Sequence, residues 1–379
     1  WYSPKCLDDL FGILKSRSGQ KAFFVMGNTS TALYQDDFDI FIDIKGVNEL
    51  YDYKISNTEL KFGGNLTLSN LIKLLDEASA TSGYEYGKVV ADHIRKVATT
   101  PLRNVGSWAG NLMIKRRHPT FPSDIFVLFE TLDAKITIGA MDGVVSSLSP
   151  AQFMKFDMDN KIIMSVTLPK FTKNDYLQTY KIMPRALSAY AYTNEAVWLN
   201  MDSAANFKVK SARIVFGGVS DTVFHACKTE QFIVGKQLGT NEGLQETLKV
   251  LEEEMKTVPA YEEIVLADAS YRKNLVCSLF YKAVLTFLGD HVGPRFRSGA
   301  SDLEYPIHEG YQMFKSDPSK YPLSQPMPKV QSKKQASGEA EYTMTVPEPP
   351  GTLHGQMVLA TVGNCKIDKI DPSEALAYP

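Results

Sequence analysis

The sequence of 379 residues lacks the features that define several large classes of protein. It has no apolar run near the roughly 20 residues of a membrane-spanning helix, and its first residues, WYSPKCLDDL, lack the charged and apolar parts of a signal peptide. Its net charge is only −2, which gives no electrostatic attraction to nucleic acid or to an anionic membrane. We therefore predict no nucleic-acid partner and no membrane partner.

Cysteine and paired metal-binding motifs are also scarce. The four cysteines are scattered at positions 6, 227, 277 and 365, without a C-x-x-C pair, so neither a structural zinc site nor an iron–sulfur cluster is predicted in this chain. The six histidines include no H-E-x-x-H, so no metal site is predicted from them. Scattered thiols favour a reducing, cytoplasmic location. Because the chain does not begin with Met, we expect it to be a fragment or a processed product.

The length of the chain predicts two or three domains, and residues 1–172 read as the first of them. Apolar runs predict strands at the following positions: 22–26, 38–44, 135–139 and 161–169. A helix is predicted at 66–78, and Ser123 is the predicted N-cap of a helix that extends to Leu132. This pattern indicates an α+β domain.

Residues 173–289 predict a second α+β domain, with a strand at 212–220 and helices at 241–256 and 271–289. The apolar stripes of these helices indicate core packing. Six prolines between 291 and 335 predict an extended linker over 290–335. Residues 336–379 predict the truncated start of a third domain, with strands at 352–362 and 364–371 and a helix beginning near 372.

Two glycine segments, VMGNTSTALY (25–34) and NVGSWAGN (104–111), lie beside apolar sequence. A glycine-bearing turn can aim successive backbone N–H groups at one point and so bind an anion, while small residues let the backbone approach closely. Neither segment matches G-x-G-x-x-G or a P-loop, and each alone also fits a tight turn or a close helix crossing. Together they predict a binding site for a phosphate bridge.

Several motifs, in order, resemble one known family. VMGNT, RNVGSWAGNLMI, PSDIFVLFETLDAKI and YKIMPRA look like the flavin domain of the molybdenum hydroxylases, which include xanthine dehydrogenase and aldehyde oxidase. FGGVS and the two helices after it resemble the next domain of that family. RSGAS and QASGEAEYTMTVPEPPGTLHGQMVLATV resemble its linker and the opening of its molybdopterin domain.

The resemblance implies a fold for each region. It implies a two-subdomain PCMH-type FAD-binding domain over residues 1–172 and a domain like the CO dehydrogenase flavoprotein C-terminal domain over 173–289. A linker at 290–335 and the truncated start of a molybdopterin-binding domain at 336–379 would follow. The expected fold class is therefore α+β.

The same resemblance implies an FAD site and no catalytic residue in this chain. The first loop, around the pyrophosphate and adenosine, would consist of Phe24, Val25, Met26, Gly27, Asn28, Thr29 and Ser30. The second loop, facing the diphosphate and ribityl chain, would contribute Gly106, Ser107, Gly110 and Asn111. Asp124 matches a carboxylate near the ribityl chain or ring, Met164 a hydrophobic contact, and Lys181 a lysine near the flavin edge. A cation there would stabilise the anionic reduced flavin.

The stretch after Lys181, IMPRALSAYAYTNEA, has no acidic residue before Glu195, which resembles the aldehyde oxidases. This stretch leaves no evident carboxylate for the ribose of NAD, so we expect dioxygen to be the electron acceptor. The alternative is a xanthine dehydrogenase, with NAD as the acceptor. In the whole enzyme an aldehyde would be oxidised at a molybdopterin-bound molybdenum, and electrons would pass through two 2Fe–2S clusters to FAD. The molybdenum and iron–sulfur domains would lie outside this chain, and the family implies a homodimer.

Three departures from the family keep other functions open. GNT is followed by STALY where relatives often have a further glycine, and an aromatic residue that xanthine dehydrogenases place over the flavin falls on Val97. The segment KRRHPTFP lengthens the second loop, and its basic run at 115–118 predicts a solvated loop. The chain could therefore be a non-catalytic paralogue that serves as a scaffold. It could also be a free-standing oxidase of the vanillyl-alcohol-oxidase type with covalently bound flavin.

Overall fold

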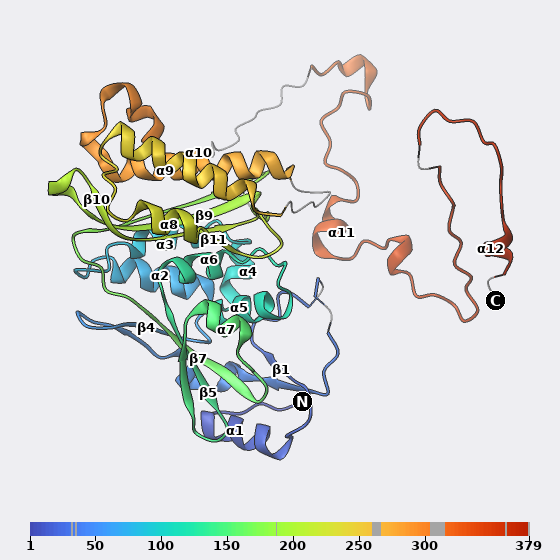
Figure 1. The fold of residues 1–379 in the computed structure, drawn as a ribbon. Helices are drawn as coiled ribbons and strands as arrows, with labels where there is room; N and C mark the ends of the chain where they lie inside the picture. The colour runs from blue at the N-terminus through green and yellow to red at the C-terminus, as the bar shows by residue number, and fades with distance from the viewer. Residues whose placement is uncertain are drawn as a thin grey trace. The chain divides into compact units, whose positions relative to one another are not determined.

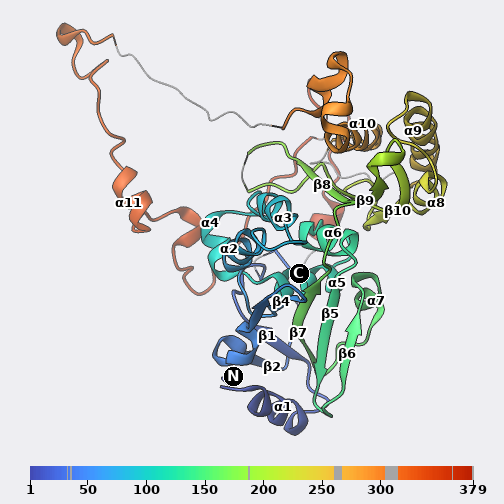
Figure 2. The ribbon, with the colours of Figure 1, turned by 90° about the vertical axis from the view of Figure 1, so that its left-hand side faces the viewer.

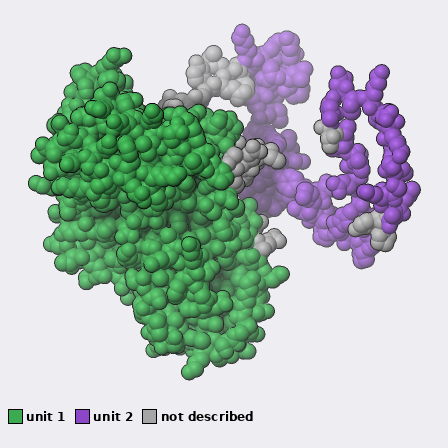
Figure 3. Space-filling model, in the orientation of Figure 1, with its two compact units in different colours: residues 1–305 green, residues 306–379 purple. Residues whose placement is uncertain are grey.

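The computed structural model describes residues 1–379 except 32, 35, 187, 260–266, 304–314, 361 and 378–379. The chain divides into two compact units, Trp1–Tyr305 (unit 1) and Pro306–Pro379 (unit 2), as Figure 3 shows. Each buried hydrophobic cluster of the described residues lies in unit 1. The candidate site is therefore a matter of unit 1 alone.

Unit 1 begins with a small subdomain around helix α1 (Leu7–Ser16). Strands β1 (Ala22–Val25) and β2 (Ile40–Asp43) pair in parallel, and the 3₁₀ turns Ile44–Gly46 and Asn48–Tyr51 follow. Leu10 and Leu14, one turn apart on α1, pack with Ile42 of β2 in a separate core. This core positions the end of β1, where the first glycine segment begins.

A five-stranded antiparallel sheet forms the centre of the first domain, in the order β3-β4-β7-β5-β6. Its strands are Tyr53–Ile55 (β3), Leu60–Gly63 (β4), Lys135–Ala140 (β5), Val145–Leu148 (β6) and Lys161–Leu168 (β7). Its helices are Leu68–Ala78 (α2), Gly87–Ile94 (α3), Thr100–Val105 (α4), Trp108–Arg117 (α5), Asp124–Thr131 (α6) and Pro150–Lys155 (α7). The largest core cluster joins this sheet to α2, α3, α5 and α6.

The next segment forms a four-stranded antiparallel sheet in the order β11-β10-β9-β8. Its strands are Asp175–Ile182 (β8), Thr193–Asp202 (β9), Lys208–Gly217 (β10) and Phe224–His225 (β11), with a 3₁₀ turn at Ser203–Ala205. Its helices are Cys227–Ile233 (α8), Asn241–Lys256 (α9) and Ala269–Leu288 (α10), followed by 3₁₀ turns at Gly289–His291 and Pro294–Ala300. These three helices pack on one face of the sheet around Leu199, Phe216 and Phe280.

The other face of this sheet is covered by the first domain. Figures 1 and 2 show α2, α3 and α6 in a layer between the two larger sheets. Every residue of α6 is buried, and its Val127 packs against Ala196 of β9 and Val215 of β10. Because one helix layer serves both sheets, the two domains are held against each other through a shared interface.

These elements confirm the α+β fold expected from sequence, with corrections in detail. The basic run at 115–118 is not a solvated loop, because Lys115, Arg116 and Arg117 form the last turn of α5 and Lys115 is buried. Residues 294–300, expected in an extended linker, form a 3₁₀ helix, and Gly299 accepts a hydrogen bond from Lys282 of α10. Among the described residues, no helix combines the length and apolar character needed to cross a bilayer.

Unit 2 has little regular structure in its described residues. It contains helices Ser332–Ser337 (α11) and Ser373–Leu376 (α12) and 3₁₀ turns at Pro318–Lys320 and Thr343–Thr345. The strands predicted at 352–362 and 364–371 were wrong, because the described residues of both stretches are irregular and exposed. A strand needs a partner for its backbone groups, and unit 2 supplies none to these segments in its described part.

Candidate functional site

The two glycine segments lie against each other. A Cβ atom added to Gly27 would sit 2.2 Å from the carbonyl oxygen of Val105 and 2.8 Å from the amide nitrogen of Gly106. A Cβ added to Gly106 would lie 3.4 Å from Oγ1 of Thr29. The first loop therefore touches the second through backbone atoms, and only glycine at position 27 allows this approach.

Two helices begin at this point of contact. Ser107 caps α5 by accepting a hydrogen bond from the N–H of Gly110 at 3.0 Å, and Thr67 caps α2 by accepting one from Asn70 at 3.2 Å. The two caps are joined by a β-bridge, and the N–H of Leu68 donates to the carbonyl of Gly106 at 2.9 Å. Neighbouring helix N-termini concentrate backbone N–H groups and partial positive charge, which favours an anionic ligand.

The first loop presents polar groups to solvent. Asn28 and Thr29 are exposed, Ser30 is half-buried, and Asn28 adopts a left-handed backbone conformation with φ of 50°. The Oγ1 of Thr31 donates to Oδ1 of Asn28, which fixes the Asn28 side chain within the loop. Thus the residues after GNT stabilise a turn without a further glycine.

The hydrophobic members of the predicted set lie toward the N-terminal subdomain. Phe24 and Val25 belong to β1, and Met26 follows it. Phe24, Met26 and Met164 all pack against the core of that subdomain, and Gly139 contacts the Met164 side chain where an added Cβ would lie 2.9 Å from its sulfur. The structure therefore brings Met164 to the same core as the first loop.

Asn111 connects the second loop to helix α6. Its Oδ1 accepts a hydrogen bond from Oγ of Ser123 at 2.5 Å, and the same Oγ accepts one from the N–H of Phe126 at 3.0 Å. Ser123 is thus the N-cap of α6, as the sequence predicts. Because the carbonyl end of the Asn111 amide is engaged, its NH₂ group is the polar end left to face a ligand.

Asp124, the first residue of α6, lies at the centre of a buried polar cluster. Its Oδ2 lies 2.9 Å from Nζ of Lys181, and its Oδ1 lies 3.2 Å from both Nε2 of His93 and Nδ2 of Asn194. Lys181 also donates to the carbonyl of Lys96 at 3.1 Å. The structure therefore brings together Asp124 and Lys181, and it adds His93 and Asn194.

The protonation states follow from these contacts. Burial alone would raise the pKa of Asp124, but the charge of Lys181 and the hydrogen bond from His93 outweigh it and hold this pKa well below its usual range. Burial lowers the pKa of His93, which favours the neutral ring with its Nε2–H donated to Asp124. The cluster is therefore an Asp–Lys ion pair supported by two neutral donors, and Lys181 is not an isolated cation.

A narrow cleft of about 20 Å³ opens beside this cluster. Its walls come from the loop before α6, the loop between β8 and β9, and the turn after β10. They include Lys115, Ser123, Tyr190, Asn194, Gly217 and Asp221. Burial lowers the pKa of Lys115 to about 8, with the opposing charge of Asp221 too weak to offset it. The cleft therefore offers both a cation and a carboxylate next to Ser123 and Asn194.

Sequence reasoning missed His93, Asn194 and Asp221. His93 and Asn194 are 31 and 70 residues from Asp124 along the chain, so no local spacing indicates that the three meet. Gly217 was placed in a predicted strand and in the FGGVS motif, and neither pattern indicates that a Cβ there would lie 1.9 Å from Oδ1 of Asn194. Gly217 at the end of β10 therefore makes room for the Asn194 amide.

Two protein-family models match most of the chain. The model "FAD binding domain in molybdopterin dehydrogenase" matches residues 1–171, and the model "CO dehydrogenase flavoprotein C-terminal domain" matches residues 178–287. Together they include both loops, the Asp124 cluster and most of the four-stranded sheet.

Individual relatives and a solved structure are also similar. Xanthine dehydrogenase 1 of Arabidopsis thaliana is 28% identical over 99% of this chain and 28% of its own length. Indole-3-acetaldehyde oxidase of Zea mays is 26% identical over 100% of this chain and 29% of its own length. Quinoline 2-oxidoreductase from Pseudomonas putida 86 has the same fold, with a TM-score of 0.61 and 20% identity over 75% of this chain and 94% of that chain. The chain thus spans less than a third of these two curated relatives.

Proposed function

Since the chain belongs to the molybdenum hydroxylase family and carries its FAD-binding portion, we propose that it transfers electrons within an enzyme that oxidises aldehydes to carboxylic acids. The same proposal makes dioxygen the final electron acceptor. It also places the molybdopterin-bound molybdenum and two 2Fe–2S clusters in partner domains, and the whole enzyme in the cytoplasm as a homodimer. The proposed order along the chain is an FAD-binding domain (1–172), a flavoprotein C-terminal-like domain (173–289), a linker (290–335) and the start of a molybdopterin domain (336–379).

The contact between Gly27 and the Val105–Gly106 backbone is the observation that carries the flavin assignment. It leaves a cradle of backbone and neutral side-chain donors at the N-termini of α2 and α5, which suits a pyrophosphate. From this cradle the hydrogen bond between Asn111 and Ser123 leads to Asp124 and Lys181. The proposed site is thus continuous from a phosphate-binding end to a buried charged end.

FAD, when bound, supplies reversible two-electron redox chemistry. We propose that the first loop and the N-terminus of α5 hold the pyrophosphate, while the Asn111 amide donates to the ligand. Asp124 and Lys181 are proposed to lie near the ribityl chain and ring. Because Asp124 neutralises Lys181, the pair presents a local dipole, and His93 and Asn194 keep that dipole in one orientation.

The proposal of dioxygen as acceptor is supported by the environment of Glu195. This first acidic residue after Lys181 is fully buried, so it offers no carboxylate to a ribose at the surface. One observation favours the alternative, NAD. Asp221 lines the cleft beside Asn194, and a carboxylate is the group that binds the hydroxyls of an NAD ribose.

Reconstitution with FAD tests the function. The purified chain should take up one FAD per chain, show a flavin spectrum, bleach under anaerobic dithionite and recover its colour in air. If NAD restores the flavin colour under anaerobic conditions, and Asp221→Asn abolishes this recovery, the electron acceptor is NAD and not dioxygen. A folded chain that takes up no FAD would support the scaffold function, and flavin that stays attached after acid treatment would support the covalent oxidase.

Replacing Asn111 by Ala tests the site. The change removes the amide that faces the proposed ligand, so FAD affinity should fall by about 1–3 kcal/mol, or roughly five- to 150-fold. The exposed Asn274 on α10 provides the matched control, and Asn274→Ala should leave FAD affinity unchanged. Isothermal titration of both variants with FAD measures the difference; equal affinities would place the flavin elsewhere.

A further inference from the structure

Three metal-ligating side chains meet at the edge of the four-stranded sheet. They are the imidazole of His225 on β11, the thiol of Cys227 at the start of α8 and the carboxylate of Glu230 on the same helix. One donor atom from each lies within 4.8 Å of the other two. The three come from the short segment 225–230, outside the proposed flavin site.

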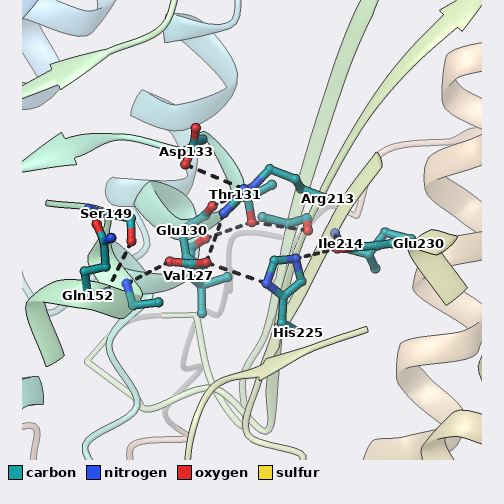
Figure 4. Close-up of polar contacts among 12 residues, drawn as sticks. Val127, Glu130, Thr131, Asp133, Ser149, Gln152, Arg213, Ile214, His225 and Glu230 are labelled. Carbon is teal, nitrogen blue, oxygen red and sulfur yellow. Dashed lines mark hydrogen bonds and ion pairs between the residues drawn. The ribbon is translucent and has the colours of Figure 1, made fainter. Parts of the chain in front are cut away.

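The ring of His225 lies between two carboxylates. Its Nδ1 lies 3.6 Å from Oε1 of Glu130, and its Nε2 lies 2.5 Å from Oε1 of Glu230; Figure 4 shows the ring between the two acids. Glu130 is itself buried and held by Nη2 of Arg213 at 3.0 Å. In metal sites a carboxylate that accepts from one ring nitrogen fixes a histidine so that its other nitrogen binds the ion. Glu130 lies at ion-pair distance from Nδ1, close enough to take that role when an ion binds.

The local structure fixes the other two donors. Cys227 and Glu230 are three residues apart on α8 and therefore lie on one face of the helix. Glu230 Oε1 also accepts the N–H of Ile214 at 2.5 Å, so the carboxylate is anchored on β10. Cys227 is exposed, which leaves the cluster open to an ion from solvent.

We propose that His225, Cys227 and Glu230 bind one zinc-type divalent cation, with a fourth position open to water. Imidazole, thiolate and carboxylate are the ligands that zinc takes in proteins, at about 2.0–2.3 Å, which places tetrahedral donors about 3.3–3.8 Å apart. His225 and Glu230 are now closer than that, so the ion separates them by about 1 Å. Bound there, the ion links β11 to α8 and lies next to Glu130 of the first domain.

The carboxylates around the cluster shift the pKa of two of its three side chains. Burial alone would lower the pKa of His225, but hydrogen bonds to Glu130 and Glu230 raise it to about 9. Burial and the nearby charges of Glu230 and Glu254 raise the pKa of the Cys227 thiol.

Cobalt(II) is the probe that reports the thiolate directly. The flavin-loaded chain, with its thiols reduced, is titrated with cobalt(II) at pH 8. Cys227→Ser and Cys365→Ser are the matched variants because both thiols are exposed. The wild type and Cys365→Ser should bind one equivalent and develop a sulfur-to-cobalt charge-transfer band. Cys227→Ser should lose the band and bind at least tenfold more weakly. His225→Gln should do the same, and it provides the test if Cys227→Ser fails to fold.

Thermal stability gives an independent readout. Zinc(II) should raise the melting temperature of the wild type and of Cys365→Ser, but not that of Cys227→Ser. A folded wild type that shows no charge-transfer band would overturn the proposal. So would a band that persists in Cys227→Ser, and either result would leave His225 as a protonated bridge between Glu130 and Glu230.

Discussion

At the residue scale, the buried carboxyl groups of Asp124 and Glu195 have opposite surroundings. Lys181 and Tyr180 of β8 lie opposite Asn194 and Glu195 of β9. The side chains of β9 alternate between the two faces of its sheet, so Asn194 reaches Asp124 while Glu195 lies beneath the helices of the second domain. Asp124 has three donors, whereas neither oxygen of Glu195 has a hydrogen-bond partner among the residues that the structure describes.

Glu195→Gln should stabilise the protein at neutral pH. Burial raises the pKa of Glu195 well above its usual value, so the folded state holds a proton that the unfolded state releases above about pH 4.5. The wild type is therefore more stable at low pH, where Glu195 is protonated in both states, and it loses stability as pH rises toward the folded-state pKa of Glu195. Gln cannot release that proton, so urea unfolding should show a gain over wild type at pH 8 that shrinks toward pH 4. A gain independent of pH would contradict this explanation.

Removing one partner of the Asp124–Lys181 pair should destabilise the protein, whereas Glu195→Gln should stabilise it. Lys181→Met leaves a buried carboxylate without its cation and should cost about 3–5 kcal/mol of unfolding free energy. The double variant with Asp124→Asn should cost less than the sum of the single changes, by about 1–3 kcal/mol. Lys210→Met, at an exposed lysine of β10, should change stability by less than about 0.5 kcal/mol. Additive effects in the cycle would mean that the pair is not coupled.

At the scale of elements, the close approach of the two loops depends on Gly27. Gly12 provides a matched control. Gly27→Ala would place a methyl group 2.2 Å from the Val105 carbonyl, so the loops must separate at a cost of about 1–3 kcal/mol, and FAD affinity should fall. Gly12→Ala, in the middle of α1 with no atom near its added Cβ, should stabilise by about 0.5–1 kcal/mol. Urea melts and FAD titrations of both variants measure the contrast. Gly27→Ala with the properties of wild type would show that the loops do not need this contact.

Elements with local determinants were predictable from sequence. Helix α9 has the bounds that were predicted, 241–256, because Thr240 supplies a cap and the apolar stripe has helical spacing. The stretch 352–371 has strand-like residues but no partner in the described part of unit 2, so strand propensity did not decide its structure. Lys115 was predicted to be solvated because the prediction used the charge of its side chain and not its burial in α5.

The site divides in the same way. The two glycine loops and the Ser123 cap could be predicted, since small residues and cap residues are local patterns. His93 and Asn194 could not, because their meeting with Asp124 depends on how α3 and β9 pack on α6. The two loops and the charged pair Asp124 and Lys181 were thus predicted from sequence, and the neutral donors His93 and Asn194 that hold the pair in place were not.

At the scale of the whole chain, stability lies in unit 1. Its three large clusters occupy the N-terminal subdomain, the five-stranded sheet and the four-stranded sheet. No described residue of 315–377 is buried, and Leu353, Met344 and Val358 are almost fully exposed. Such apolar side chains need a partner surface to be covered.

Removing residues 304–379 should therefore leave the melting temperature within about 2 °C of the full chain and FAD affinity unchanged. Limited proteolysis should cut the full chain within 315–377, where the described backbone is exposed, and yield a stable product containing unit 1. Differential scanning calorimetry of the shortened chain provides the measurement. A fall of 10 °C would show that unit 2 contributes to the core.

The helix layer that serves two sheets has an evolutionary consequence. A gene rearrangement that carried residues 1–172 without 173–289 would expose the face of α6 that carries Val127 to water. The reverse rearrangement would uncover Ala196 and Val215 of the four-stranded sheet. Selection against aggregation would remove both products, so recombination is expected to move this pair of domains as one inherited cassette.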